Sequence, residues 1–204
     1  MIAAILLAAG RSSRMNYPKP LLEWRGRTLL EHQMDQLARL PVAEIIVVLG
    51  HETDRILEKV SSHDQRVSFI ICDDFQEGLS ASLKCGLQHA EGKYDSVLLM
   101  LVDLPLIQPG TFEQVCETGA QLQDTFNEPF VVQPICHQQP GHPVFIGHFE
   151  QLNWHSLQGD LGAKPLIKQM KNRILLESED RGVVFDIDTP QAYMEAIKIE
   201  EVRK

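Results

Sequence analysis

The sequence lacks any hydrophobic run long enough to cross a membrane. Its longest apolar stretches, Met1 to Ala9 and Val97 to Val102, are much shorter than the roughly 20 residues that a transmembrane helix needs. The first stretch has no basic segment before it, so it does not resemble a secretory signal peptide either. We therefore expect a cytoplasmic protein with no membrane partner.

Cysteine is scarce, and positive charge is not in excess. The four cysteines are scattered, without the close pairing of a zinc site or the density of a disulfide framework. The formal net charge of -9 argues against a nucleic-acid partner, because a broad binding surface for nucleic acid needs clustered cations. Any anion must therefore be bound locally, by a few cations or by a metal.

Short apolar runs without alternation recur in the first half of the chain, which is typical of strands covered on both faces of a parallel sheet. Segments with helical spacing lie between them. This order predicts an α/β fold with a three-layer, doubly wound and mostly parallel sheet. The predicted strands are residues 2–8, 45–49, 67–71 and 97–102, and the helical segments are residues 29–37, 56–60 and 79–87.

The second half is less regular, with helices predicted after Gly162 and after Pro190. Neither an internal repeat nor a convincing linker divides the chain. A length of 204 residues with 44% hydrophobic composition suits one globular domain, residues 1–204. The strand-like pieces of this half are residues 130–133, 144–146, 174–176 and 183–185.

A loop of small and basic residues follows the first predicted strand, at the sheet edge where open α/β folds bind ligands. The small residues from Leu7 to Gly10 let the backbone approach a ligand, and N–H groups in a turn can hold phosphate oxygens. Arg14 and Lys19 supply the countercharge for a triphosphate. The loop is neither a Walker A motif nor a Gly-x-Gly-x-x-Gly fingerprint. An ordinary surface turn is the alternative interpretation.

Two aspartates are candidate magnesium ligands. Asp103 directly follows the apolar run 97–102 and should lie at the carboxyl end of a strand. Magnesium in phosphoryl-transfer sites is usually held by one or two carboxylates and by substrate phosphates. Asp188 follows the strand-like piece 183–185 and precedes a helix, where capping of that helix is the alternative role. Asp186 would face the same side as Asp188 if the strand continued.

The loop resembles the signature of the MobA-like nucleotidyltransferases, and among them the molybdenum cofactor cytidylyltransferases. The resemblance rests on Leu7-Ala8-Ala9-Gly10-x-Ser12-x-Arg14-Met15 with Pro18-Lys19. It implies a Rossmann-like fold of the nucleotide-diphospho-sugar transferase type. It also implies Asp103 and Asp188 as the metal ligands. The implied triphosphate-binding residues are Leu7, Ala8, Ala9, Gly10, Arg14 and Lys19.

The stretch from Glu77 to Leu83 resembles the same family and opens a predicted helix. Free N–H groups at a helix start can receive a phosphate or the edge of a ribose or base, although a plain serine cap is the alternative. The resemblance implies nucleotide contacts for Gly78, Ser80, Ser82 and Asp103. Segments around Gly141 to Val144 and Gly159 to Ala163 complete the pattern. The acceptor-binding residues that the resemblance implies are His142, Gly159, Asp160, Gly162 and Asp186.

The implied reaction transfers CMP from CTP to the phosphate of the molybdopterin (molybdenum) cofactor and releases pyrophosphate. Mg²⁺, or Mn²⁺ in its place, is the implied cofactor, and Arg14, Lys19 and Asp103 are the implied catalytic residues. The product would serve a molybdenum hydroxylase of the xanthine dehydrogenase type. Ala9 favours CTP over GTP, because guanylyl-transferring relatives have glycine there. The chain departs from many relatives at Asn16 and Leu104, neither of which removes a charged group.

Three other functions are compatible with parts of this pattern. A transferase of the same fold could use GTP or charge a sugar phosphate or another phosphate acceptor. A non-catalytic accessory protein could bind the molybdenum cofactor and carry it to a hydroxylase. A glycosyltransferase is suggested by Asp186-x-Asp188, but the position of this pair near the end of the chain and the Arg14 and Lys19 loop at its start argue against it.

Overall fold

The computed structural model describes residues 1–203, and Lys204, the last residue of the predicted domain, lies outside the described part. A central eight-stranded sheet has the order β10-β7-β9-β6-β1-β4-β5, and β8 pairs with β7. Neighbouring strands along this order are parallel except at β9, which runs antiparallel to β6 and β7. The strands are β1 (Ile2–Leu7), β4 (Glu44–Leu49), β5 (Val67–Ile71), β6 (Ser96–Leu101), β7 (Phe130–Cys136), β8 (Gln139–Pro140), β9 (Val144–Gly147) and β10 (Asn172–Glu177), with a small hairpin of β2 (Glu23–Trp24) and β3 (Arg27–Thr28).

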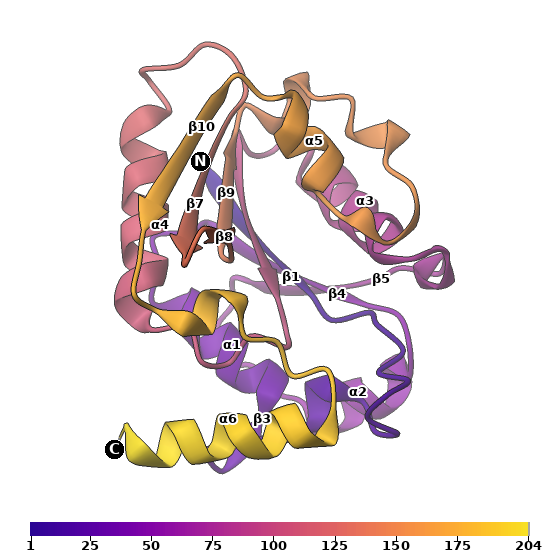
Figure 1. Ribbon diagram of the computed structural model, residues 1–204. Coiled ribbons are helices and arrows are strands. Elements are labelled where there is room, and N and C mark those ends of the chain that lie inside the picture. Colours follow the sequence, from indigo (N-terminus) through magenta and orange to yellow (C-terminus); the bar gives the residue numbers. More distant parts are fainter. Residues whose placement is uncertain (204) are drawn as a thin grey trace.

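Helices cover both faces of the sheet (Figure 1). On one face, α3 and α5 pack over the sheet, while α1 and α4 lie on the other face and α6 runs below α1 in the view of Figure 1. No helix within residues 1–203 combines the length and apolar character that a bilayer crossing requires. The helices are α1 (Leu29–Ala38), α2 (Thr53–Lys59), α3 (Leu79–Ala90), α4 (Pro109–Leu122), α5 (Lys164–Gln169) and α6 (Pro190–Val202).

The central strands explain the three layers. Alternate side chains of a strand point to opposite faces, and in β1 both sets are apolar and fully buried. Ala4 and Leu6 join the core with α1 and α4, whereas Ala3 and Ile5 join the core with α3 and α5. Two hydrophobic cores therefore flank one sheet, as predicted for a doubly wound α/β fold.

Side-chain caps fix two of the helix starts. Thr28 and Glu31 form a reciprocal capping box at the start of α1. At α6, the Thr189 hydroxyl accepts the Ala192 N–H, and Pro190 occupies the first turn, where its missing N–H is not needed. Both starts lie beside the segments that carry candidate site residues.

Two parts of the sequence-based description were wrong or incomplete. Residues 183–185 do not form a strand, because Arg181–Val184 is a short 3-10 helix. The Asp180 carboxylate accepts the Gly182 N–H and bends the chain there. A Cβ on Gly182 would lie 2.3 Å from the backbone of Leu106, so the backbone at Gly182 packs closely against the segment after β6. Helix α4 was not predicted at all.

Three parallel strands end at one edge of the sheet. Strand β1 lies between β4 and β6, with Leu7 opposite Val48 on one side and Leu101 on the other. Backbone hydrogen bonds continue past the strand ends, from Ala8 N–H to Val48 and from Val102 N–H to Leu7. The loop after β1 and the segment of Asp103 are thereby held side by side.

Candidate active site

Lys19 lies at the centre of a cluster of charged side chains. It begins a short 3-10 helix, Lys19–Leu21, and its backbone N–H donates to the Ser12 hydroxyl over 2.9 Å. Its ammonium donates to Asp103 Oδ2 over 2.7 Å and also to Asp188 Oδ1. With only 13% of its side chain exposed, Lys19 bridges the two carboxylates from a largely buried position.

Asp103 lies two residues beyond the end of β6. One carboxylate oxygen, Oδ2, accepts from Lys19, while the other, Oδ1, is buried and has no hydrogen-bond partner among residues 1–203. A buried charged oxygen without a partner is costly unless a ligand satisfies it. This oxygen is therefore a candidate position for a cation.

Asp188 faces the same cluster from the other end of the chain. Its Oδ2 forms an ion pair with the Arg14 guanidinium at 2.8 Å, and its Oδ1 accepts a hydrogen bond from the Lys19 ammonium. Helix α6 is capped by Thr189, so the capping alternative applies to Thr189 and not to Asp188. The Asp188 carboxylate therefore pairs with Lys19 and Arg14 and does not cap the helix.

The cluster shifts the pKa values of its members in opposite directions. Burial alone would lower the pKa of Lys19, but Asp103 and Asp188 outweigh it and raise that pKa above its ordinary value. Burial would raise the pKa of Asp188, but Lys19 and Arg14 lower it below its ordinary value. Asp186 is different: burial, followed by the charges of Asp188 and Asp103, raises its pKa.

Asp186 was predicted to face the same side as Asp188 along a continuing strand, and that reason was wrong because no strand exists there. It is nevertheless close enough to Asp188 and Asp103 for their charges to act on it. Three aspartates and two cations therefore share this edge of the sheet.

The donor set fits a hard divalent cation. Mg²⁺ and Mn²⁺ prefer oxygen ligands, and the partnerless Asp103 oxygen supplies one on a carboxylate that Lys19 links to Asp188. Within the described residues, no group of three or more His, Cys, Asp or Glu side chains gathers as a complete metal cage. Asp103 and Asp188 would therefore hold such an ion together with oxygens of a substrate.

His142 lies on the neighbouring antiparallel segment, just before β9. Its Nδ1 is 3.4 Å from the carbonyl oxygen of Leu99 in β6, and burial lowers the pKa of its imidazole. The charge of Asp103 also acts on this imidazole. A mostly neutral histidine therefore lies near the carboxylate cluster.

The start of α3 forms a second group of candidate residues. Gly78 is the N-cap, so the expected alternative of a serine cap was wrong. The Leu79 N–H instead donates to Asp160 Oδ1 over 3.2 Å, and the Ser80 hydroxyl donates to the carbonyl oxygen of Gln158 over 3.1 Å. The loop that contains Gly159, Asp160 and Gly162 is thereby fixed to the helix.

The structure thus assembles the candidate residues in two groups. Arg14, Lys19, Asp103 and Asp188 are joined by direct contacts, and Asp186 and His142 lie within reach of their charges. The residues at the start of α3 and the 159–162 loop are joined by contacts of their own, and Ser82 is buried within that helix. Leu7, Ala8 and Ala9 are buried, and Gly10 is exposed, at the end of β1.

Sequence reasoning missed two polar contributors. Ser12 holds the backbone of Lys19, and the Gln158 carbonyl receives Ser80. Ser12 belongs to the quoted loop motif, which is a usable signal, but a backbone carbonyl leaves no trace in residue identity.

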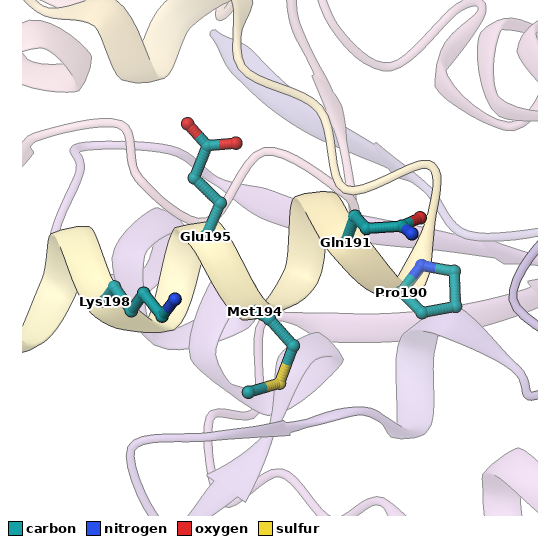
Figure 2. A pocket seen from close by; sticks show the side chains of 5 residues that line it. All are labelled: Pro190, Gln191, Met194, Glu195 and Lys198. Atoms are coloured by element: carbon teal, nitrogen blue, oxygen red, sulfur yellow. The ribbon is translucent and has the colours of Figure 1, made fainter.

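A shallow hollow of about 510 Å³ lies elsewhere, on the outer face of α6. Figure 2 shows that its five lining side chains all come from this one helix, with Met194 and Glu195 pointing to different sides. It includes neither the loop after β1 nor Asp103. The charge cluster, not this hollow, is therefore the candidate active site.

Comparison with solved structures supports the fold. A nucleotidyl transferase from Methanothermobacter thermautotroptrophicus superposes with a TM-score of 0.80 and 23% identity, covering 100% of this chain and 98% of that one. Rv0371c from Mycobacterium tuberculosis, in a complex with manganese, gives a TM-score of 0.72 and 23% identity over 97% and 98% of the two chains. Molybdopterin-guanine dinucleotide biosynthesis protein A from Archaeoglobus fulgidus gives 0.64 and 18% identity over 98% and 99%.

Sequence relatives and a family model define the family. The bifunctional protein GlmU of Bifidobacterium adolescentis is 33% identical to this chain over 55% of its length. The matched part covers only 25% of that relative's length. Nicotine blue oxidoreductase of Paenarthrobacter nicotinovorans is 25% identical over 92% of both chains. The family model of the MobA-like NTP transferase domain matches residues 4–174. The chain belongs to the MobA-like NTP transferase domain family.

Proposed function

We propose that this nucleotidyltransferase transfers CMP from CTP to the phosphate of the molybdopterin (molybdenum) cofactor and releases pyrophosphate. The observation that carries the proposal is the bridge from Lys19 to Asp103 and Asp188, beside a buried Asp103 oxygen without a partner. Such a group of cations and carboxylates matches a reaction that needs positioning and charge neutralisation more than a protein nucleophile.

Arg14 and Lys19 would bind the triphosphate. Lys19 is nearly buried and would turn its ammonium from the carboxylates to the phosphates, whereas Arg14 has 69% of its side chain exposed and would follow the phosphates from the solvent side. The backbone from Ala8 to Gly10 would approach them closely, because these residues carry almost no side chain. Both cations would stabilise the negative charge that develops on the leaving pyrophosphate.

Asp103 and Asp188 would hold Mg²⁺, or Mn²⁺ in its place. The bound ion would neutralise charge on the phosphates and act as a Lewis acid. Rv0371c, a protein of the same fold, has been crystallised in a complex with manganese, which supports the use of a divalent ion.

The acceptor would approach from the side of His142 and the 159–162 loop. One of its phosphate oxygens would attack the α-phosphorus of CTP, forming a new P–O bond as the bond to pyrophosphate breaks. Asp160 and Gly159 are fixed against α3 and would provide a rigid wall for the acceptor. Asp186 would lie on the acceptor side of the cluster, where burial and the charges of Asp188 and Asp103 raise its pKa.

Two features bear on the choice of base and on the protein served. Ala9 is buried at the end of β1, where a methyl group leaves less room than the glycine of guanylyl-transferring relatives, and this favours CTP over GTP. A molybdenum hydroxylase is the proposed recipient of the product.

A redox enzyme is the second candidate, because nicotine blue oxidoreductase matches this chain over 92% of both lengths. The ion-paired carboxylates favour nucleotidyl transfer, since hydride transfer has no need of a metal-binding aspartate pair. Reduction of nicotine blue by the purified protein, supplied with an electron donor, would favour this candidate.

The test is pyrophosphate release from CTP and from GTP with Mg²⁺, with and without molybdopterin cofactor. Acceptor-dependent release with CTP supports the proposal. Release with GTP alone would identify a guanylyltransferase, and release only with a sugar phosphate would identify another transferase of this fold. Binding of the molybdenum cofactor without any release would indicate a carrier.

A further inference from the structure

Protein cations occupy most of the candidate metal-binding oxygens. The Lys19 ammonium pairs with Asp103 Oδ2 and Asp188 Oδ1, and the Arg14 guanidinium pairs with Asp188 Oδ2. The remaining oxygen of the pair, Asp103 Oδ1, is the buried one without a partner in the described part of the chain. At Asp188 both oxygens already pair with a protein cation, so a metal ion held by both aspartates would have to share an oxygen with that cation or replace it.

Lys19 is the stronger of the two competitors. Its side chain is 13% exposed, and its backbone is fixed by the Ser12 hydroxyl. Like charges repel more strongly where water is scarce, so an ammonium and a divalent ion are poorly tolerated on the same carboxylates. Arg14 is mostly exposed and can leave Asp188 with less resistance.

We propose that Lys19 competes with the divalent metal for Asp103 and Asp188, so that metal and nucleoside triphosphate reinforce each other's binding. Phosphate oxygens offer Lys19 and Arg14 a new countercharge, and their movement toward the phosphates frees the carboxylates for the metal. Both ligands require the same rearrangement, and such coupling is reciprocal. The proposal rests on the triphosphate-binding part of the proposed function and is independent of the acceptor.

The first measurement is Mn²⁺ binding to the protein without nucleotide, followed by the electron paramagnetic resonance signal of free Mn²⁺. Lys19→Gln removes the competing charge, and its Mn²⁺ affinity is expected to rise about tenfold or more, within the usual range of such couplings. Lys171→Gln is the matched control, because Lys171 pairs with Glu128 on the surface, away from the cluster. This control should bind Mn²⁺ as the wild type does.

The second measurement is binding of CTP in the presence of EDTA, by calorimetry. Lys19→Gln should bind metal-free CTP about tenfold more weakly or worse, because it lacks the phosphate-binding charge. Opposite changes for the two ligands distinguish competition from damage to the fold, which would weaken both. Unchanged or weaker Mn²⁺ binding by a folded Lys19→Gln protein would overturn the proposal.

If Lys19→Gln does not fold, Mn²⁺ binding is measured with Arg14→Gln instead. This substitution frees Asp188 Oδ2 and should raise Mn²⁺ affinity severalfold, and no increase would count against the competition. The outcome is separable from the proposed reaction. A chain that shows these opposite changes but releases no pyrophosphate with the molybdopterin cofactor would retain the competition and lose the acceptor assignment.

Discussion

The backbone N–H of Ile187 donates to the carbonyl oxygen of Asp103 over 2.8 Å. This single bond joins the segment after β6 to the segment before α6. Ile187 itself is fully buried, so its flanking residues Asp186 and Asp188 are held beside Asp103 by packing as well as by the hydrogen bond. The carboxylates can therefore repel one another without moving apart, and this repulsion is what Lys19 and Arg14 offset.

Asp103→Asn is expected to abolish most turnover while leaving the fold intact. The amide keeps the shape of the carboxylate but loses the charge that the metal requires, and loss of one such electrostatic group typically lowers kcat by about 100-fold to 1,000-fold. The measurement is pyrophosphate release with CTP and acceptor at saturating Mg²⁺, with circular dichroism as the check on folding.

Asp124→Asn is the matched control for this substitution, because Asp124 is an exposed aspartate after α4. Its rate should equal that of the wild type. If Asp103→Asn retained wild-type turnover, Asp103 could not be the central metal ligand.

Gly78→Ala should destabilise the junction between α3 and the 159–162 loop. Gly78 has φ +108°, and an added Cβ would lie 2.5 Å from Asp160 Oδ1 and 2.7 Å from the backbone of Gly159. A backbone conformation of this kind costs roughly 1–3 kcal/mol for residues other than glycine. Urea unfolding should show a loss of this size, together with a higher KM for the acceptor.

Gly110→Ala provides the contrast to Gly78→Ala. Gly110 lies in the first turn of α4, and an added Cβ there would meet no atom within 4 Å. Alanine should leave stability unchanged or raise it by about 0.4–1 kcal/mol. Equal losses of stability in the two variants would mean that the loss in Gly78→Ala does not come from its contact with the 159–162 loop.

The sequence allowed the sheet and the position of Asp103 to be predicted, because buried parallel strands appear as uninterrupted apolar runs. Helix α4 escaped prediction because its buried face includes Thr111, Cys116 and Gly119, which weakens the apolar stripe. The strand predicted at residues 183–185 failed because the Asp180 side chain bends the chain through a contact that apolar patterning does not register. The Lys19 bridge depends on three distant segments, so sequence could suggest its members but not their contacts.

Thr28→Ala should lower stability without affecting the reaction. The Thr28 hydroxyl accepts the Glu31 N–H, while the Glu31 carboxylate accepts the Thr28 N–H. Loss of such a cap costs about 1 kcal/mol, which corresponds to a fall in Tm of roughly 2–4 °C for a protein of this size. Thr28→Ser keeps the hydroxyl and should recover most of the loss in a thermal melt. A Thr28→Ala protein as stable as the wild type would show that the capping box contributes nothing measurable.

His32 should make the protein sensitive to mild acid. Burial, followed by the charge of Arg25, lowers the pKa of His32 from 6.5 to about 4. The folded state therefore binds fewer protons than the unfolded state in this range, so stability falls as the pH drops from 6.5 toward 4. Between pH 7 and pH 5 the contribution of His32 is about 2 kcal/mol. Urea unfolding of His32→Gln should show a correspondingly smaller loss, whereas the exposed control His63→Gln should follow the wild type; identical losses in all three proteins would contradict the assignment.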